Sequence, residues 1–519
     1  MRAPSLIMAR AVTVGAAERH RGCLRASPSA DSSVTFGGRV TGSAPNPLSV
    51  VALLRAPHRP RGTSMTAHET TQDVVLAALA QGVTGRVLAG TDPDARLSGM
   101  NVAVEHRPDY VVHATSADDV QATVRTAQRF GLPVTVFSTG HGFARGIEGG
   151  IAVSTAGLTG VEVDQPARTA RIAAGSRWKD VLDVVTPLGL AAVTGSSPDV
   201  GAVGFLLGGG IGPLAREVGF GSSYLVAADV VTGDGTLLHV DDEHHPEILR
   251  ALRGGKWGLG VVTSVTVRLL NLEKVTGGNF FALGDDAATL FRAYAEWVPS
   301  APSDITTSIA LLRLPPLEFL PEPLRGQYVA NVRVASTRPL AEVESAIAPL
   351  RTTVPILMDT IAEIPYAAIG GVHADPTEPM PFIDGSTLLH TFEPQTAEAV
   401  LAVAGPQTQT PLMMTEIRHL GGALADGTNG PDSVTGRDAA FALFTIGLPV
   451  PELFETAVPA AINGLLEATQ PWSLGRTQAN FAGTISQAAP VDLWSPADQA
   501  HLATVRREID PDGRFALPA

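Results

Sequence analysis

The sequence has a single cysteine, Cys23. One thiol excludes an intrachain disulfide and a metal site built from several thiolates, and it is typical of a chain that works in a reducing compartment. Runs of eighteen apolar residues are also missing, as is an N-terminal basic start followed by an apolar stretch and a small-residue cleavage site. We therefore expect a cytoplasmic protein that is neither exported nor inserted in a membrane.

Positive charge is scarce, with 37 Lys and Arg against 51 Asp and Glu and a formal net charge of -14. Residues 1–64 carry nine Arg and two acids, so the remainder of the chain carries -21. A nucleic-acid partner requires a basic surface that displaces the counterions of the phosphates. This charge balance argues against such a partner.

Residues 1–64 are rich in Arg, Ser, Pro, Gly and Ala and show no apolar period of 2 or 3.6 residues. We expect this leader to be disordered. Translation starting at Met65 would make it an artefact, and a targeting peptide is the alternative. The remaining residues suffice for two domains.

Residues from about 85 to 272 show an α+β pattern. Residues 110–112 predict a short strand. Ser116 is the expected cap of a helix that ends at Gly131, and residues 134–137 predict another strand. A second such helix is predicted, with Ser176 as its cap. The apolar side of this helix consists of Trp178, Val181, Leu182 and Val185. Gly233 and Gly235 predict a hairpin turn between two later strands.

Residues 273–474 differ, because longer amphipathic helices at 287–298, 339–350 and 452–469 alternate with strands at 327–335 and 413–420. We predict a second domain whose strands form one sheet with helices on a single face, leaving the other face for a ligand. The predicted division is a leader at 1–64, a first domain at 65–272 with its core at about 104–272, a second domain at 273–474, and a C-terminal segment at 475–519.

Three segments, 138–142, 195–201 and 208–212, consist largely of glycine and small residues. Their bare backbone N–H groups can form concave nests for a pyrophosphate, and glycine allows close approach of the ligand. A rival interpretation is the dinucleotide fingerprint GxGxxA at 210–215, with Asp229 as the ribose-binding acid of a nicotinamide-dependent Rossmann enzyme. Against it, the fingerprint normally follows a strand directly.

In the order of its motifs the sequence resembles the vanillyl-alcohol oxidase superfamily with its PCMH-type FAD-binding domain, and specifically the berberine-bridge-enzyme-like branch. The resemblance is carried by the loop 138–142, the segment 195–212, the stretch 252–263 and the closing stretch 509–515. It extends from about residue 105 to residue 519. It implies an FAD-linked oxidoreductase with a two-subdomain FAD-binding domain and a substrate domain whose antiparallel sheet is covered by helices.

The resemblance also implies a set of cofactor-binding residues. These are Ser138, Thr139, Gly140, His141, Gly142, Ser196, Ser197, Asp199, Val200, Gly201, Gly204, Gly208, Gly209, Gly210, Gly212, Gly260, Val262 and Asn480. In the family, a histidine at the position of His141 is bonded through a ring nitrogen to the 8α-methyl group of the flavin. A histidine between glycines is otherwise a turn residue.

Many relatives carry a second link through a cysteine where this sequence has Ser197. Because Cys23 lies in the leader, we expect a single link, through His141. The Tyr-x-Asn motif that usually supplies the base of the family corresponds here to Gln478 and Asn480, and glutamine cannot act as a base. Another residue must take the proton of the substrate.

Our preferred candidates lie on the predicted strand 413–420, where Glu416 and Arg418 share one face and His419 takes the other. An arginine neighbour would keep the carboxylate ionised. The alternative is a cross-strand charge pair on a solvated face. Asp426, shortly after a glycine pair, is a second candidate, and we interpret Asp241–His245 as a solvated loop and not a metal site.

Together these features predict an FAD-dependent oxidase or dehydrogenase that oxidises a small alcohol, sugar or secondary metabolite by hydride transfer to flavin N5, with molecular oxygen as a plausible acceptor. One alternative is a flavin-binding protein whose catalytic base has been lost. The other is the nicotinamide-dependent Rossmann enzyme.

Overall fold

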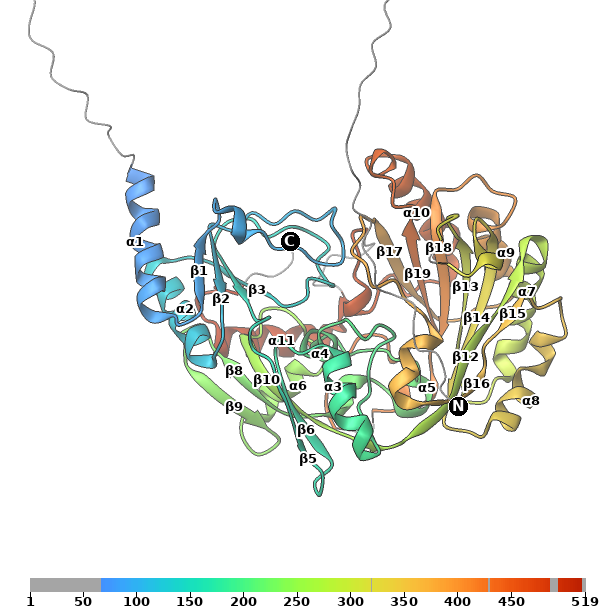
Figure 1. The fold of residues 1–519 in the computed structure, drawn as a ribbon, viewed down its shortest axis with the longest axis horizontal. Coiled ribbons are helices and arrows are strands. Elements are labelled where there is room, and N and C mark those ends of the chain that lie inside the picture. Colours follow the sequence, from blue (N-terminus) through green and yellow to red (C-terminus); the bar gives the residue numbers. More distant parts are fainter. Residues whose placement is uncertain (1–66, 319, 428–429, 486–492, 516–519) are drawn as a thin grey trace, which may run out of the picture. The chain divides into compact units, whose positions relative to one another are not determined.

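The computed structural model describes residues 67–318, 320–427, 430–485 and 493–515, which are coloured in Figure 1. Cys23, the predicted disorder of 1–64 and the alternative start at Met65 lie outside the described residues. No helix within the described ranges is both long and apolar enough to span a membrane.

The first sheet has four strands in the order β1-β2-β4-β3. Strands β2 and β3 run parallel to β4, and β1 is antiparallel to β2. The predicted strands at 110–112 and 134–137 are confirmed. The elements of this layer are β1 (Arg86–Ala89), β2 (Tyr110–His113), β3 (Val134–Phe137), β4 (Ile151–Ser154) and the helices α1 (Ala67–Gly82) and α2 (Ala117–Phe130) that pack beside it.

Helix α2 has the predicted limits because both of its caps are local. Ser116 Oγ accepts a hydrogen bond from the backbone N–H of Asp119 at 3.2 Å, and Gly131 closes the helix with a left-handed φ of 67°. The carboxylate of Asp119 accepts hydrogen bonds from the backbone N–H groups of Thr84 at 2.7 Å and Thr115 at 2.8 Å. Asp119 therefore also fixes the chain that enters β1.

The second sheet is antiparallel, with its five strands in the order β5-β6-β10-β8-β9. The predicted hairpin turn at Gly233–Gly235 connects β8 and β9. The strands are β5 (Val161–Asp164), β6 (Thr169–Ala173), β8 (Leu225–Val231), β9 (Leu237–Asp241) and β10 (Val261–Arg268), and a separate pair consists of β7 (Leu190–Ala191) and β11 (Leu270–Asn271). Helix α3 (Trp178–Val185) is capped by Arg177, and the prediction of Ser176 as its cap was wrong, because the Ser176 hydroxyl bonds the backbone of Gly160.

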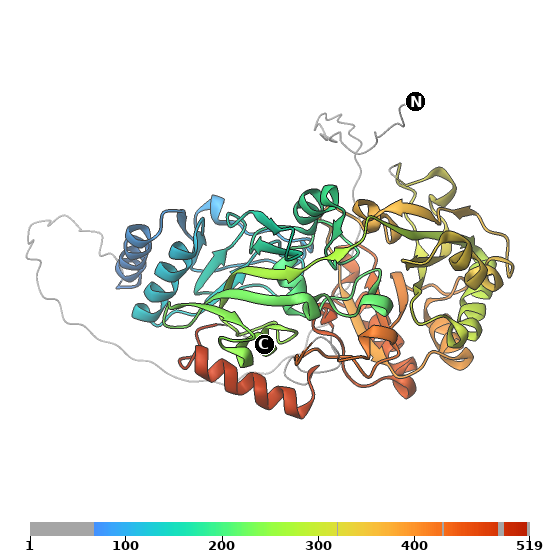
Figure 2. The same ribbon diagram turned by 90° about the horizontal axis from the view of Figure 1, so that it is seen from below.

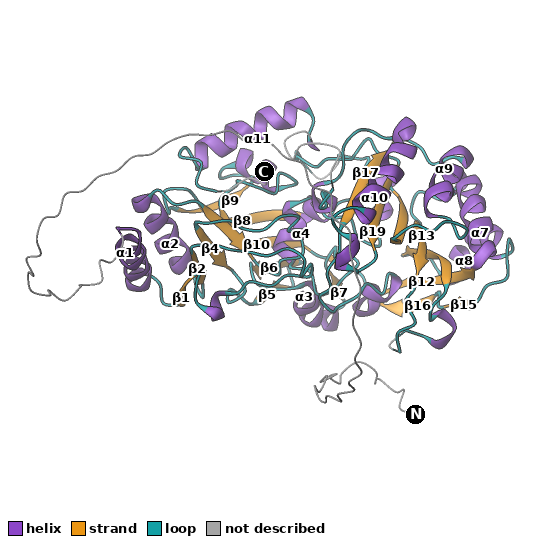
Figure 3. Cartoon of the chain, turned by 90° about the horizontal axis from the view of Figure 1, so that it is seen from above, coloured by secondary structure: helices purple, strands orange, loops and turns teal. Residues whose placement is uncertain are grey.

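The third sheet is antiparallel and has eight strands, of which seven follow the order β15-β12-β14-β13-β18-β19-β17, with β16 beside β12. Its strands are β12 (Lys274–Leu283), β13 (Thr306–Arg313), β14 (Tyr328–Ser336), β15 (Met358–Asp359), β16 (Ala362–Pro365), β17 (Asp384–Leu389), β18 (Leu412–His419) and β19 (Phe441–Gly447). One face packs a large apolar cluster against the helices α7 (Gly284–Trp297), α8 (Leu340–Arg351), α9 (Pro394–Ala404) and α10 (Ala457–Ala468) (Figures 1 and 3). The sheet is thus covered by helices as predicted.

The predicted helices and strands of this region agree with the structure to within three residues except at one boundary. The helix expected over 452–469 begins only at Ala457. Pro459 explains the late start, because proline is tolerated in the first turn of a helix and not in its interior.

Two hydrophobic clusters dominate the core. The largest collects residues between Val75 and Leu269 together with residues between Ala479 and Phe515, and the second lies between Phe280 and Leu466. The domain boundaries themselves stay a prediction. Helix α11 (Pro496–Ile509) packs on α6 (Pro246–Leu252), and Figure 2 shows it in red beside the green strands.

The topology contradicts the Rossmann alternative. Residues 210–215 lead into the four-residue helix α5 (Ala215–Val218), and Asp229 lies on β8 of an antiparallel sheet. A dinucleotide fingerprint requires a parallel βαβ unit at this point. The GxGxxA match is therefore coincidental.

Candidate functional site

The loop 138–142 follows β3 and exposes its backbone. None of its N–H groups donates a hydrogen bond within the part of the chain that the structure describes. Gly140 has a φ of 71°, and a Cβ there would lie 2.5 Å from Cα of Gly99. The loop is thus closely packed from one side and presents free donors for an anion from the other.

The segment 195–201 lies directly beside this loop. It pairs with the start of α3, since Trp178 N–H donates to Val200 O at 3.0 Å. A Cβ on Gly201 would lie 3.2 Å from Ser138 Oγ, and the Gly201 N–H is 3.4 Å from Thr139 Oγ1. The backbone N–H groups of Ser196, Ser197 and Asp199 donate to no other described residue. Two of the predicted segments therefore form one surface of unpaired donors.

His141 stands at the junction of these two segments. Its Nδ1 lies 3.1 Å from Thr139 Oγ1. Burial and the positive charge of Arg177 lower the pKa of the imidazole, while Asp199 works in the opposite direction. Asp199 is held at 3.2 Å by Arg177 and at 2.9 Å by Lys179. His141 is therefore neutral at pH 7, and a neutral imidazole keeps a lone pair for bonding.

The C-terminal stretch 477–481 lies against the third glycine segment. Gln478 is fully buried, donates from Nε2 to Gly208 O and accepts from the Asn480 N–H at 2.8 Å. Asn480 donates from Nδ2 to Phe205 O at 2.8 Å, and a Cβ on Gly208 would overlap its side chain. Gln478, predicted as a catalytic residue, thus holds the backbone that follows α4 (Ala202–Leu207), and Asn480, predicted both as catalytic and as cofactor-binding, holds the last turn of that helix.

Several predicted cofactor glycines have a packing reason of their own. A Cβ on Gly212 would overlap Thr194 O, and one on Gly260 would lie 2.6 Å from Val230 Cγ1. Gly209 and Gly210 adopt φ values of 95° and 78°. Gly204, in contrast, is exposed and its Cβ would meet no atom within 4 Å. For these positions, and for Val262 on the buried strand β10, cofactor contact stays a prediction.

Lys256 was missed by the sequence reasoning. Its Nζ donates to Asn480 Oδ1 at 2.8 Å and to Ala479 O at 3.0 Å. A Cβ on Gly142 would lie 3.4 Å from this Nζ, and the Lys256 N–H donates to Leu207 O at 3.0 Å. The available signal was a lone lysine inside the run Gly-Gly-Lys-Trp-Gly.

The open face of the third sheet carries a row of polar side chains. Ser308 on β13 lies opposite Arg333 on β14 and opposite Arg418 on β18. Glu416 is two residues before Arg418 and points to the same face. Its Oε1 accepts from Arg333 at 2.5 Å and from Ser308 at 2.8 Å, and its Oε2 accepts from Arg418 at 2.7 Å.

This carboxylate is fully buried. Burial alone would raise the pKa of Glu416, but the charges of Arg418 and Arg333 outweigh it and hold the pKa well below its usual range. The predicted pairing of Glu416 with Arg418 is present. The alternative of a solvated charge pair is wrong, because the two side chains are 0% and 12% exposed.

A second contact joins this cluster to the glycine segments. Ser196 Oγ donates to Asp375 Oδ2 at 2.5 Å. Asp375 is close enough to raise the pKa of Arg418 together with Glu416, against the effect of burial. His373 Nε2 lies 3.7 Å from Glu416 Oε1, and burial with the two arginines lowers its pKa to about 3.

A small cavity lies between Gly212 and this sheet face, lined by Arg333, His373, Arg418 and His419 among others. Three of its polar atoms, Arg333 Nε, His373 Nδ1 and His419 Nδ1, have no partner among the described residues. Asp426 does not reach this cluster. It is exposed, and its backbone oxygen accepts from Arg437 at 3.1 Å.

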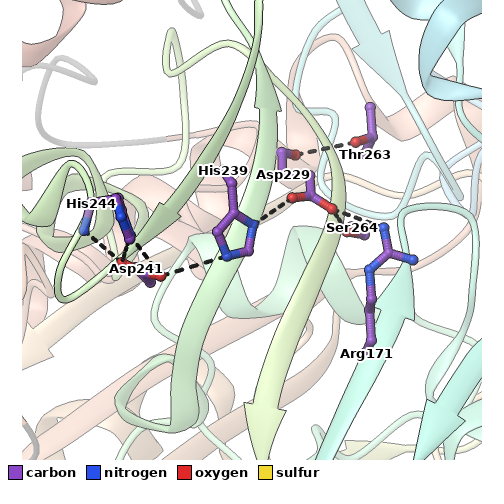
Figure 4. Close-up of polar contacts among 7 residues, drawn as sticks. All are labelled: Arg171, Asp229, His239, Asp241, His244, Thr263 and Ser264. Atoms are coloured by element: carbon purple, nitrogen blue, oxygen red, sulfur yellow. Dashed lines mark hydrogen bonds and ion pairs between the residues drawn. The ribbon is translucent and has the colours of Figure 1, made fainter.

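The acids and histidines of the second sheet form a separate surface network (Figure 4). Asp229 accepts from Arg171 and His239 at 2.8 Å and from Ser264 at 2.7 Å. His244 Nδ1 lies 3.0 Å from Asp241 Oδ1, and its side chain is 66% exposed. No cluster of three or more His, Cys, Asp or Glu residues in the described ranges could hold a metal ion.

Comparison with known proteins identifies the first part of the chain. Residues 108–241 match the FAD binding domain family. The FAD-dependent monooxygenase FUP4 of Fusarium proliferatum (strain ET1) is 35% identical over 208 residues, which are 39% of this chain and 40% of that protein. This relative is therefore matched over less than half of its length.

Two further proteins are matched over most of their length. The (R)-6-hydroxynicotine oxidase of Paenarthrobacter nicotinovorans is 27% identical over 429 residues, covering 79% of this chain and 90% of that protein. The solved structure of the BBE-like 1 protein of Physcomitrella patens has a TM-score of 0.74 at 17% identity, covering 86% of this chain and 98% of that one. At this identity the structural likeness shows the fold. The chain therefore contains an FAD binding domain at residues 108–241, and it has the fold of a berberine-bridge-enzyme-like protein.

Proposed function

We propose that this protein binds FAD across the loop 138–142 and the segment 195–212 and oxidises a small alcohol, sugar or secondary metabolite. The observation that supports this most directly is the surface of unpaired backbone donors formed where 138–142 meets 195–201, with His141 at the junction. Such a surface suits the diphosphate of a dinucleotide.

The residues present fit FAD. Gly142 and Gly204 are exposed, and no side chain fills the space beside Gly204. Ser197 Oγ is buried without a hydrogen-bond partner among the described residues. A buried hydroxyl without a partner is unfavourable, so a polar ligand at this point would stabilise the site.

We further propose a single covalent bond between His141 and the flavin. The neutral imidazole has the lone pair that the bond requires, and Thr139 orients the ring. Ser197 stands where relatives carry a cysteine, and a serine hydroxyl is a poor nucleophile. His141 is thus the one side chain of these two glycine segments suited to the linkage.

Bound FAD would supply the acceptor, at flavin N5, for a hydride from the substrate. The open face of the third sheet would orient the substrate, since Arg418 is held rigidly by Glu416 and lies 5.0 Å above the ring of Phe481. With its low pKa, Glu416 is a weak base. We therefore infer that Glu416 acts as a fixed counterion for Arg333 and Arg418.

The second candidate function is a flavin-binding protein without turnover. It is favoured by Gln478, which replaces the usual tyrosine and has both ends of its amide engaged. The two candidates differ in one measurement. Purified protein with absorption bands near ~370 and ~450 nm that bleaches anaerobically with a substrate supports the enzyme, whereas bands that no alcohol, sugar or amine bleaches support the binding protein.

We also propose that molecular oxygen is the electron acceptor. The name of the 27%-identical relative, an oxidase, favours molecular oxygen. Oxygen consumption coupled to substrate oxidation, measured with an electrode, would support an oxidase. Turnover only with an artificial dye would identify a dehydrogenase.

A further inference from the structure

Lys256 brings together three parts of the chain that are far apart in sequence. Its backbone N–H bonds Leu207, which precedes the third glycine segment, and its ammonium bonds Ala479 and Asn480 in the C-terminal stretch. The same ammonium lies beside Gly142, which follows His141. Lys256 thus occupies the point where the segments proposed to hold FAD converge.

The ammonium has no counterion in the part of the chain that the structure describes. Its hydrogen-bond acceptors are an amide oxygen and a backbone carbonyl oxygen, and no Asp or Glu of the described ranges lies within ion-pair distance. It also lies 5.1 Å above the ring of Trp257. Burial lowers the pKa of Lys256 to about 7, because the charged form is poorly solvated there. An anion in contact with Nζ would restore the charge.

The backbone at Lys256 is strained as well. Its φ of 53° lies in the left-handed region, which a long side chain adopts at a cost. Gly254 and Gly258 on either side have φ values of 113° and 71°. Glycine at position 256 would fit this backbone better, so lysine is accommodated there at a local energetic cost.

We propose that Lys256 provides the positive charge that contacts an anionic group of the bound flavin nucleotide. This inference rests on the proposed function. The anionic group is either the diphosphate or the pyrimidine end of the ring system, which gains electron density when it is reduced. In both cases a half-buried cation without a counterion among the described residues faces the negative charge of its ligand.

Three substitutions separate charge from folding. K256M removes the charge and keeps the aliphatic stem, K256R keeps the charge, and K256G removes the charge while relieving the backbone. The matched control is K274M on β12, because Lys274 is 62% exposed and pairs with Glu363 at the surface. Thermal unfolding of each variant reports whether it folds.

The experiment uses the H141A background, in which FAD is bound without the proposed covalent link and its affinity can be titrated. Contact with the diphosphate predicts that K256M and K256G bind FAD at least about tenfold more weakly, with riboflavin affinity unchanged. Contact with the ring predicts a reduction potential lower by about 30 mV, which corresponds to a tenfold change for a two-electron couple. K256R and K274M should resemble the parent in both measurements.

Two results are decisive against this inference. If K256M and K256G matched the parent in FAD affinity, riboflavin affinity and reduction potential, the role of Lys256 would be overturned while the proposed function stayed intact. Wild-type protein that binds no flavin at all would overturn the proposed function, and this inference with it.

Discussion

Nη1 of Arg216 lies 2.8 Å from Nε2 of His419, which links helix α5, just after the third glycine segment, to strand β18. The same guanidinium donates to the carbonyl oxygens of Ile305 at 3.1 Å and Pro302 at 3.2 Å. Since arginine can only donate, His419 must be neutral to accept this bond. Burial and the charge of Arg216 lower the pKa of His419 to about 3.

This contact predicts a specific loss of stability in acid. An unfolded histidine has a pKa of about 6.5, so the contribution of His419 is complete above about pH 6.5 and is lost as the pH falls toward 3. H419Q keeps an acceptor that cannot be protonated. Between pH 7 and pH 5 it should lose about 1–2 kcal/mol less unfolding free energy than the wild type. Urea unfolding at both pH values measures this, and H390Q at an exposed position is the control.

Equal losses in H419Q and the wild type would show that the contact with Arg216 does not set the acid dependence.

Replacement of Glu416 should destabilise the protein before it affects any chemistry. E416Q leaves Arg333 and Arg418 buried without their counterion, and removal of one partner from a buried ion pair costs about 3–5 kcal/mol. E363Q, which removes an exposed partner of Lys274, should change the unfolding free energy by less than about 1 kcal/mol. Denaturant unfolding of both variants makes the comparison.

If E416Q were as stable as the wild type while inactive, Glu416 would return as a candidate base.

Asp119 should make the stability of the protein sensitive to acid, through its contacts beside the first sheet. Although burial works against it, the hydrogen bonds from Thr115 and Thr84 lower the pKa of Asp119 to about 2. The unfolded value is about 3.9, so its stabilisation is present above that pH and is lost as the pH falls to about 2. D119N should therefore be less stable at pH 7 and show a shallower decline below pH 4. A decline as steep as that of the wild type would contradict the assignment.

Gly204 allows a test that separates folding from cofactor binding. It lies in α4, and alanine is favoured over glycine in a helix by about 1 kcal/mol, so G204A should be at least as stable as the wild type without flavin. Its Cβ would enter the open space beside the glycine segments. We therefore predict normal folding with reduced flavin content, measured by absorbance of the purified protein. Full flavin content in G204A would mean that FAD does not lie over this helix.

The sequence was sufficient to predict those elements whose limits depend on neighbouring residues. Ser116 and Gly131 predicted both ends of α2 because caps and left-handed glycines act on adjacent backbone. The predicted start of α10 was wrong because Pro459 fits a helix only within its first turn. The glycine segments were identified for the same local reason, since side-chain-free backbone is visible in a sequence.

The remaining site depends on contacts that no local pattern encodes. Lys256 meets Asn480 across 224 positions, and Arg333 meets Glu416 only because β13 lies between β14 and β18 in one register. A shift of one residue in either strand pairing would point these side chains to opposite faces. The role of Glu416 as a counterion, and the position of Lys256, required the tertiary structure.

The most direct test of the account is the absorption spectrum of acid-precipitated protein, with H141A treated in parallel. Covalent attachment at His141 predicts that the wild-type pellet keeps the flavin colour after washing, whereas the H141A protein releases its flavin to the supernatant. A colourless wild-type pellet with a yellow supernatant would contradict the covalent bond. A wild-type protein without flavin in either fraction would contradict the binding of FAD itself.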